Sequence, residues 1–184
     1  FYIPDWRGFG GSAQCRIPKL DAISSHWQDL NCFLEQQTHH QFRVIAYSMG
    51  ATTAMHGLQY GHFQKHVYSY LHIDQTPKIC VDAEWSHGLF AEKHKDFKTI
   101  LQNIAELLAQ NTQYNLVSEL KPTTRTQLVD YWFAFMQLQA KPSRSTVLFQ
   151  KAFQQPRLQK FLLPIQRLDY MAWYIHNYLY VIPK

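Results

Sequence analysis

The sequence lacks the patterns that mark secreted disulfide domains and membrane-spanning proteins. Its three cysteines lie far apart, without a C-x-x-C pair, and an odd, unclustered count favours a reducing compartment over a disulfide framework. The chain contains no apolar run long enough to cross a bilayer, and no signal-peptide pattern opens it. These absences predict a cytoplasmic protein without a membrane span.

Concentrated positive charge is missing as well. The formal net charge is +5 and the pI is near 9.1, yet the lysines and arginines are scattered and form no stripe typical of nucleic-acid binding. We therefore expect no nucleic-acid partner. The 184 residues are enough for one domain with a hydrophobic core, and the 15% share of aromatic residues indicates a bulky, apolar interior or pocket.

Strand and helix patterns alternate through residues 1–81. Short β-prone runs occur at residues 1–3, 42–47 and 67–73, and helical patterns of apolar or small residues separate them. The order strand, helix, strand, helix, strand is typical of a parallel α/β sheet with right-handed crossovers. We therefore predict an α/β fold class for this part of the chain.

The pattern becomes helical from residue 82 onwards. Four segments have apolar residues at helical spacing, including two shorter pieces at Val147–Phe153 and Leu158–Leu163. We expect these segments to form a helical cap over residues 82–164. Strand character returns at Tyr178–Ile182, so the last segment, residues 165–184, is expected to rejoin the sheet.

A serine stands between small residues where a predicted strand meets a predicted helix. The stretch Ala46-Tyr47-Ser48-Met49-Gly50 is similar to G-x-S-x-G, in which the serine hydroxyl projects from a sharp strand-to-helix turn. Alanine replaces the first glycine and adds one methyl group. A buried, hydrogen-bonded serine in a crowded corner is the alternative interpretation of the same five residues.

Three motifs in order resemble the α/β-hydrolase superfamily, in particular its cap-bearing, esterase-like branch. Residues 5–12 match D-x-R-G-x-G-x-S, residues 46–50 match the nucleophile elbow about 35 residues later, and residues 73–77 match I-D-x-x-P. The resemblance implies a partial α/β-hydrolase fold, with a mainly parallel sheet, helices on both faces and a helical cap insertion. Residues 1–81 would be the first part of the core, and residues 165–184 a truncated return to it.

The resemblance implies a serine hydrolase that acts on a small-molecule ester or related acyl substrate without a cofactor or metal ion. Ser48 would be the nucleophile and the backbone N–H of Met49 one oxyanion donor. The second donor would precede Phe1, and the triad acid and histidine would follow Lys184. We therefore expect a fragment that is inactive on esters by itself and poorly soluble, because part of its sheet is uncovered.

Several residues keep two interpretations. Asp74 is a candidate acid, although an aspartate that caps the turn before Pro77 is the simpler hypothesis. Four aromatic residues either line an acyl pocket above the serine or simply pack the helices: Tyr47, Trp132, Phe133 and Phe135. The fold could also serve C–C cleavage, lyase or acyl-transfer chemistry, or survive as a non-catalytic homologue.

The ten histidines include no obvious base. His72 lies within a predicted strand, and His176 precedes one. The pair His62 and His66 has the i, i+4 spacing of a metal site on a helix, but it lacks the glutamate of H-E-x-x-H and a third ligand. We therefore predict no metal site.

Overall fold

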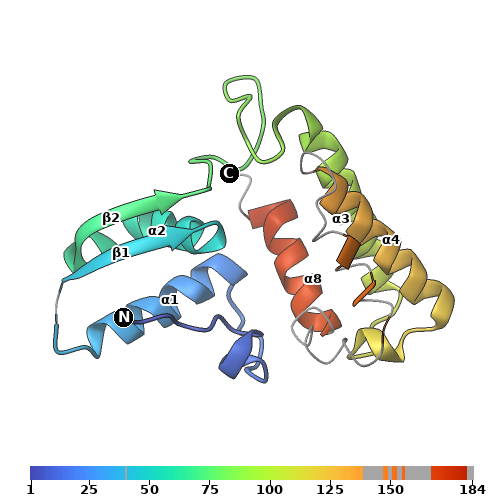
Figure 1. Cartoon of the computed structure of the whole chain (residues 1–184), viewed down its shortest axis with the longest axis horizontal. Coiled ribbons are helices and arrows are strands. Elements are labelled where there is room, and N and C mark those ends of the chain that lie inside the picture. The colour runs from blue at the N-terminus through green and yellow to red at the C-terminus, as the bar shows by residue number, and fades with distance from the viewer. Residues whose placement is uncertain (40, 139–146, 149–150, 153–154, 156–166, 182–184) are drawn as a thin grey trace.

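The computed structural model describes residues 1–39, 41–138, 147–148, 151–152, 155 and 167–181. These residues form two halves that meet along one side of helix α8 (Figure 1). One half contains two strands and two helices from the first part of the chain, and the other contains helices only. Each half has its own cluster of buried apolar side chains.

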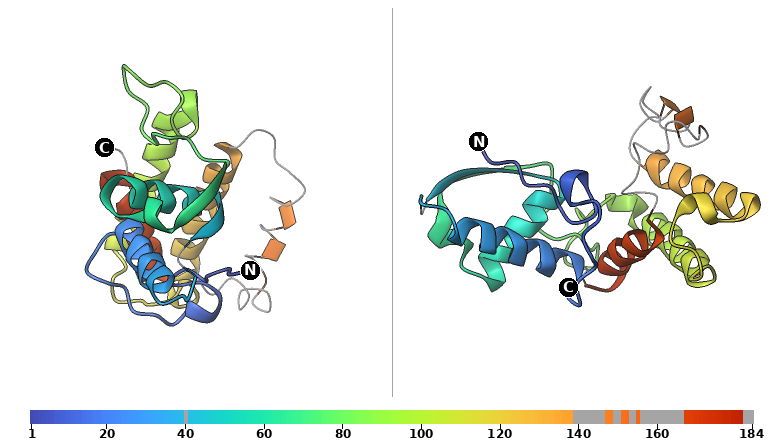
Figure 2. Two further views of the ribbon diagram at one scale, coloured as in Figure 1. Left: turned by 90° about the vertical axis from the view of Figure 1, so that its left-hand side faces the viewer. Right: turned by 90° about the horizontal axis from the view of Figure 1, so that it is seen from below.

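The first half is a β-α-β unit preceded by a helix. Strands β1 (Phe42–Tyr47) and β2 (Val67–Ile73) pair in parallel, and α2 (Met49–Tyr60) connects them. Helix α1 (Ala22–Glu35) packs beside α2, and both lie on the same face of the sheet (Figure 2). The strand expectations for residues 42–47 and 67–73 are thus confirmed.

The core of this half is built from one large ring and several small residues. Trp27 of α1 is buried against α2, where a Cβ atom added to Gly57 or Gly61 would overlap its indole ring. Ala46, at the end of β1, is 6% exposed and belongs to the same core. Small side chains therefore let α1, α2 and the sheet approach closely.

The opposite face of the sheet is apolar and open. Ile45 and Leu71 lie side by side in the two strands and are 70% and 54% exposed. Tyr47 and Ile73, the next outward pair, are exposed too. Strands that are buried on both faces carry continuous apolar runs, but here the described residues cover only the side of α1 and α2.

The second half is a packed group of helices. Helices α3 (His94–Ala109), α4 (Pro122–Leu138) and α8 (Leu168–His176) surround a core that includes Ile104 and Leu128, both fully buried. Helix α8 continues as a π-helical turn over Asn177–Val181. Short 3-10 helices occupy Gly10–Ser12, Phe63–His66, Ala91–Lys93 and Val117–Glu119.

The predicted fold class is wrong. We expected a mainly parallel sheet with helices on both faces, but the described residues are mostly helical and contain a sheet of only two strands. The partial α/β-hydrolase fold, with its mainly parallel sheet and cap insertion, therefore does not describe this architecture. Within the described part of the chain, helices cover only one face of the two strands, as the views in Figure 2 show.

Both outer strands of the prediction are absent from the sheet. Phe1–Ile3 has no regular secondary structure and pairs with neither strand. Its Tyr2 ring contacts Phe33 and Phe42, but these contacts do not replace a hydrogen-bonded partner. Tyr178 to Val181 is helical instead of extended, because Leu179 is buried in the helical core. Tertiary packing overrides the β-propensity of these aromatic and branched residues.

Two predicted helical pieces fall mainly outside the described residues. Leu158–Leu163 lies outside them entirely, and Val147–Phe153 is described only at residues 147–148 and 151–152, which are helical. Among the helices of the described part, none combines the length and apolar character that crossing a bilayer requires.

Candidate functional site

Ser48 sits at the sharp turn between β1 and α2. Its backbone has φ 50° and ψ −119°, a combination that residues with a Cβ atom rarely adopt. Two backbone contacts hold the turn: the Ser48 N–H donates to the Ile73 carbonyl oxygen at 3.1 Å, and the Ser48 carbonyl accepts from Ala51 N–H at 2.9 Å. The turn therefore ties the ends of both strands to the start of α2.

The first residues of α2 give this turn an electrostatic direction. The N–H groups of Met49 and Gly50 have no partner inside their own helix, because the first N–H groups of any α-helix point away from it. Such groups favour negative charge at the helix N-terminus. The space around the turn differs at its two small residues. A methyl group at Gly50 would meet only the Trp6 ring, at 3.9 Å. Crowding therefore explains why position 46, which is buried, has a small side chain, but it does not explain why position 50 is glycine.

Asp74 follows β2 and lies at the same edge of the sheet as Ser48. Its φ of 54° is left-handed, a conformation that aspartate tolerates better than most residues. The next residue, Gln75, is anchored to the start of α2 by a 2.5 Å hydrogen bond from its side-chain amide to Thr52 Oγ1. Asp74 is exposed.

A cavity of about 560 Å³ separates this edge from the helical half. Ser48, Asp74 and Gln75 line it on the sheet side, and the helical half contributes a wall of rings and aliphatic side chains. Its volume is typical of small-molecule sites. The remaining lining residues are Phe9, Tyr47, Leu89, Phe90, Phe97, Leu101, Trp132, Phe135, Met171, Tyr174, Ile175 and Tyr178.

Unusual backbone conformations converge on this cavity. Four non-glycine residues of the described part have positive φ: Ser48, Asp74, Phe90 and Ala91. Three of them line the cavity, and Ala91 directly follows Phe90. Such conformations cost of order 1–3 kcal/mol each and persist where the surrounding structure enforces them, commonly at functional sites. Their convergence marks the cavity independently of any sequence motif.

Three of the four predicted pocket aromatics reach the cavity. Tyr47, Trp132 and Phe135 line it, whereas Phe133 does not. Trp132 and Phe135 also pack on the helical core and meet edge to face with their ring centroids 5.5 Å apart. The two interpretations of these residues are therefore compatible, because the same rings close the core and form the cavity wall.

No histidine reaches Ser48 in the described part of the chain. Nine of the ten histidines are described, and none lines the cavity. His72 lies within hydrogen-bonding distance of the Tyr70 hydroxyl (2.9 Å) and the Gln75 carbonyl (2.8 Å), which occupies both ring nitrogens. His66 ends a 3-10 turn instead of sharing an α-helical face with His62, so the metal-site spacing argument does not hold there.

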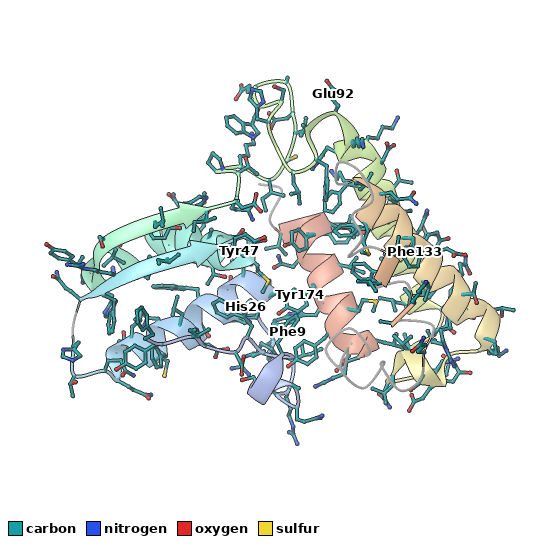
Figure 3. The ribbon with its side chains drawn as sticks, viewed as in Figure 1. Phe9, His26, Tyr47, Glu92, Phe133 and Tyr174 are labelled. Atoms are coloured by element: carbon teal, nitrogen blue, oxygen red, sulfur yellow. The ribbon has the colours of Figure 1, made fainter. Side chains whose placement is uncertain are left out.

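A buried histidine contacts one of the residues that line the cavity. His26 of α1 is fully buried, and its Nε2 lies 2.7 Å from the hydroxyl oxygen of Tyr174, which lines the cavity. Burial lowers the pKa of His26 to about 4 and raises the pKa of Tyr174. Both side chains are therefore neutral near pH 7. Figure 3 shows His26 and Tyr174 with Phe9 where α1, α8 and the N-terminal loop meet.

The glycine-rich loop before α1 has a structural role. Gly8 and Gly10 have positive φ, and a Cβ atom at Gly8 would press against the Tyr170 ring. The Arg7 guanidinium forms a two-pronged ion pair with Asp29, at 2.6 and 2.7 Å. The loop thus fixes Phe9 at the cavity edge.

Several cavity residues were missed by sequence reasoning. Met171, Ile175 and Tyr178 line the cavity from α8 and its continuation, and their i, i+4, i+7 spacing is a helical signal inside a segment that we assigned partly to a strand. Phe9 and Phe90 reach the cavity through glycine-loop packing and a left-handed backbone. Neither feature leaves a periodic pattern in the sequence.

No protein-family model matches the chain, and neither a curated protein nor a solved structure matches it.

Proposed function

We propose that Ser48 is the nucleophile of a serine hydrolase that acts on an ester or related acyl substrate. One observation carries this proposal: Ser48 adopts a strained backbone conformation at a strand-to-helix turn and lines an apolar cavity. The strain is part of what exposes a hydroxyl at the start of a helix. A buried structural serine would need neither the cavity nor the strained turn.

In the proposed reaction, the Ser48 hydroxyl oxygen attacks the carbonyl carbon while a base accepts its proton. The new C–O bond places negative charge on the carbonyl oxygen, and the Met49 N–H at the start of α2 is the proposed donor to it. The C–O bond to the leaving alcohol then breaks, and the alcohol takes up the proton. Water releases the acyl group from Ser48 by the same sequence.

Among the described residues, this arrangement has no group that could act as the base. A serine hydroxyl without a base is a poor nucleophile, and none of the described histidines lines the cavity. We propose that the base is a group other than the nine described histidines. Asp74 remains a candidate acid because it lines the same cavity. The described residues alone therefore do not supply everything that ester turnover requires.

Chemical labelling tests the nucleophile directly. We expect an alkyl fluorophosphonate to phosphonylate Ser48 slowly, and at least tenfold faster when imidazole is added as an external base that accepts the hydroxyl proton as fluoride leaves. Ser48→Ala should abolish the labelling, whereas Ser69→Ala, which removes an exposed serine of β2, should not change it. Peptide mapping that finds no label on Ser48 in a folded, imidazole-treated sample would contradict the proposal.

The absence of any described histidine from the cavity lining also favours a second candidate, a binding cavity without catalysis. A chain that binds apolar ligands but resists labelling at Ser48 would support this alternative. The same result would exclude C–C cleavage and acyl transfer through Ser48, since both need an activated hydroxyl.

A further inference from the structure

The helical wall of the cavity contains a connected group of aromatic rings among aliphatic side chains such as Leu101 and Ile175. Phe90 lies 5.0 Å from Phe97 and 5.6 Å from Phe135, measured between ring centroids, and Phe97 meets Tyr178 edge to face at 6.3 Å. Each ring carries negative potential on its face, and several rings around one space add their attraction for a cation. These rings therefore add a preference for cations that aliphatic side chains alone would not provide.

The charge of the cavity points in the same direction. Asp74 is the one charged residue among the described side chains that line the cavity, and it forms no ion pair within the described part of the chain. The cavity has no described lysine or arginine to receive a carboxylate or phosphate. The net charge of +5 comes from residues elsewhere, and salt screens its effect at distances above about 10 Å.

We propose that the Ser48 cavity binds a cationic ligand with a quaternary or tertiary ammonium group, and that this group belongs to the ester of the proposed reaction. The ammonium group would lie among the rings, and Asp74 at the sheet edge would balance its charge. Cation–π attraction is strongest for such desolvated, weakly hydrated cations. This inference names the substrate class and rests on the proposed function for the ester, while the binding step stands on the cavity alone.

Two ligands of the same shape, one cationic and one neutral, show how much the positive charge contributes to binding. (3-Hydroxyphenyl)trimethylammonium and 3-tert-butylphenol differ by one nitrogen in place of one carbon, so both fill the same space. Trp132 lines the cavity and provides a fluorescence signal, and calorimetry supplies an independent dissociation constant. We expect the cation to bind roughly tenfold more tightly than its neutral isostere, a ratio that cation–π attraction can supply.

Two variants assign this preference to the cavity. Asp74→Asn should weaken binding of the cation about threefold, as expected for an exposed carboxylate, and leave the neutral compound unchanged. The matched control is Asp130→Asn, which removes the same charge from an exposed position of α4 away from the cavity and should change neither constant. Trp132→Leu should cost the cation more affinity than the neutral compound.

The outcomes distinguish this inference from the proposed nucleophile. Equal or tighter binding of 3-tert-butylphenol would overturn the ligand class, whatever the labelling of Ser48 shows. An equal loss with Asp74→Asn and Asp130→Asn would also overturn it, because overall charge and not the cavity would then be responsible. Both dissociation constants are measured without a reaction at Ser48, so a failed labelling experiment would leave the binding result unchanged.

Discussion

The two halves of the molecule bury their apolar side chains to different extents. In the helical half, α3, α4 and α8 enclose large side chains such as Ile104 and Leu128 on all sides. In the strand-containing half, α1 and α2 cover one face of the sheet, while Ile45 and Leu71 remain exposed on the other. Helices can close around a core by themselves, whereas a sheet needs cover on both of its apolar faces.

The cavity lies between the strand-containing half and the helical half. The strand-containing half supplies the polar groups, Ser48, Asp74 and Gln75, at the edge where its parallel strands end. The helical half supplies the aromatic wall from side chains that also belong to its core, such as Phe97 and Phe135. The polar groups of the cavity therefore lie at the strained turn of one half, and the packed core of the other half determines the shape of the cavity.

The largest expected effect is on the helical core. Leu128 is fully buried, so Leu128→Ala should lower the free energy of unfolding by about 3 kcal/mol, from lost burial and the cavity left behind. The same change in the other half, Leu71→Ala, removes a side chain that is 54% exposed and should cost less than about 1 kcal/mol. Urea unfolding of both variants measures the comparison, and similar losses would show that the two halves do not differ in this way.

The second effect concerns the contact that joins the halves. His26 of α1 lies against Tyr174 of α8, and burial lowers its pKa to about 4 from a reference value of 6.5. Between these pH values, His26 is protonated in the unfolded chain but stays neutral in the folded protein. The free energy of unfolding therefore falls as the pH falls from 6.5 to 4. The full loss is roughly 3 kcal/mol, and it ends below the folded pKa.

A variant isolates this contribution from other titrating groups. His26→Phe keeps an aromatic ring beside Trp6 but removes the proton-binding site, so its unfolding free energy should depend less on pH between 4 and 6.5. His56, whose pKa is also lowered by burial, should preserve part of the slope. His39→Asn changes an exposed histidine and serves as the control. An unchanged pH slope in His26→Phe would contradict the assignment.

The sequence predicts local secondary structure better than it predicts which elements pack against one another. The strands at residues 42–47 and 67–73 and the turn at Ser48 could be predicted, because short apolar runs and small residues determine them within a few positions. Tyr178 could not be placed, since its β-propensity is outweighed by the burial of its neighbour Leu179 among α3 and α8. Phe9 and Phe90 reach the cavity through contacts that no spacing rule records.

The smallest expected effect on stability concerns the open face of the sheet. The double variant Ile45→Thr, Leu71→Thr replaces two exposed apolar side chains, so the free energy of unfolding should change by less than about 1 kcal/mol. Association should change far more, because exposed apolar strands promote contacts between chains. We expect the unmodified chain to form multimers as its concentration rises in sedimentation velocity experiments, and the double variant to remain mostly monomeric.

Leu20→Thr is the control for this variant, because Leu20 is exposed outside the sheet. It should leave association unchanged, since an isolated apolar side chain on the surface is ordinary, whereas the paired Ile45 and Leu71 belong to a contiguous patch. A clean monomer of the unmodified chain at every concentration would show that the open face does not drive association. The contrast between the halves would then be one of burial alone, without consequence for how the molecule behaves in solution.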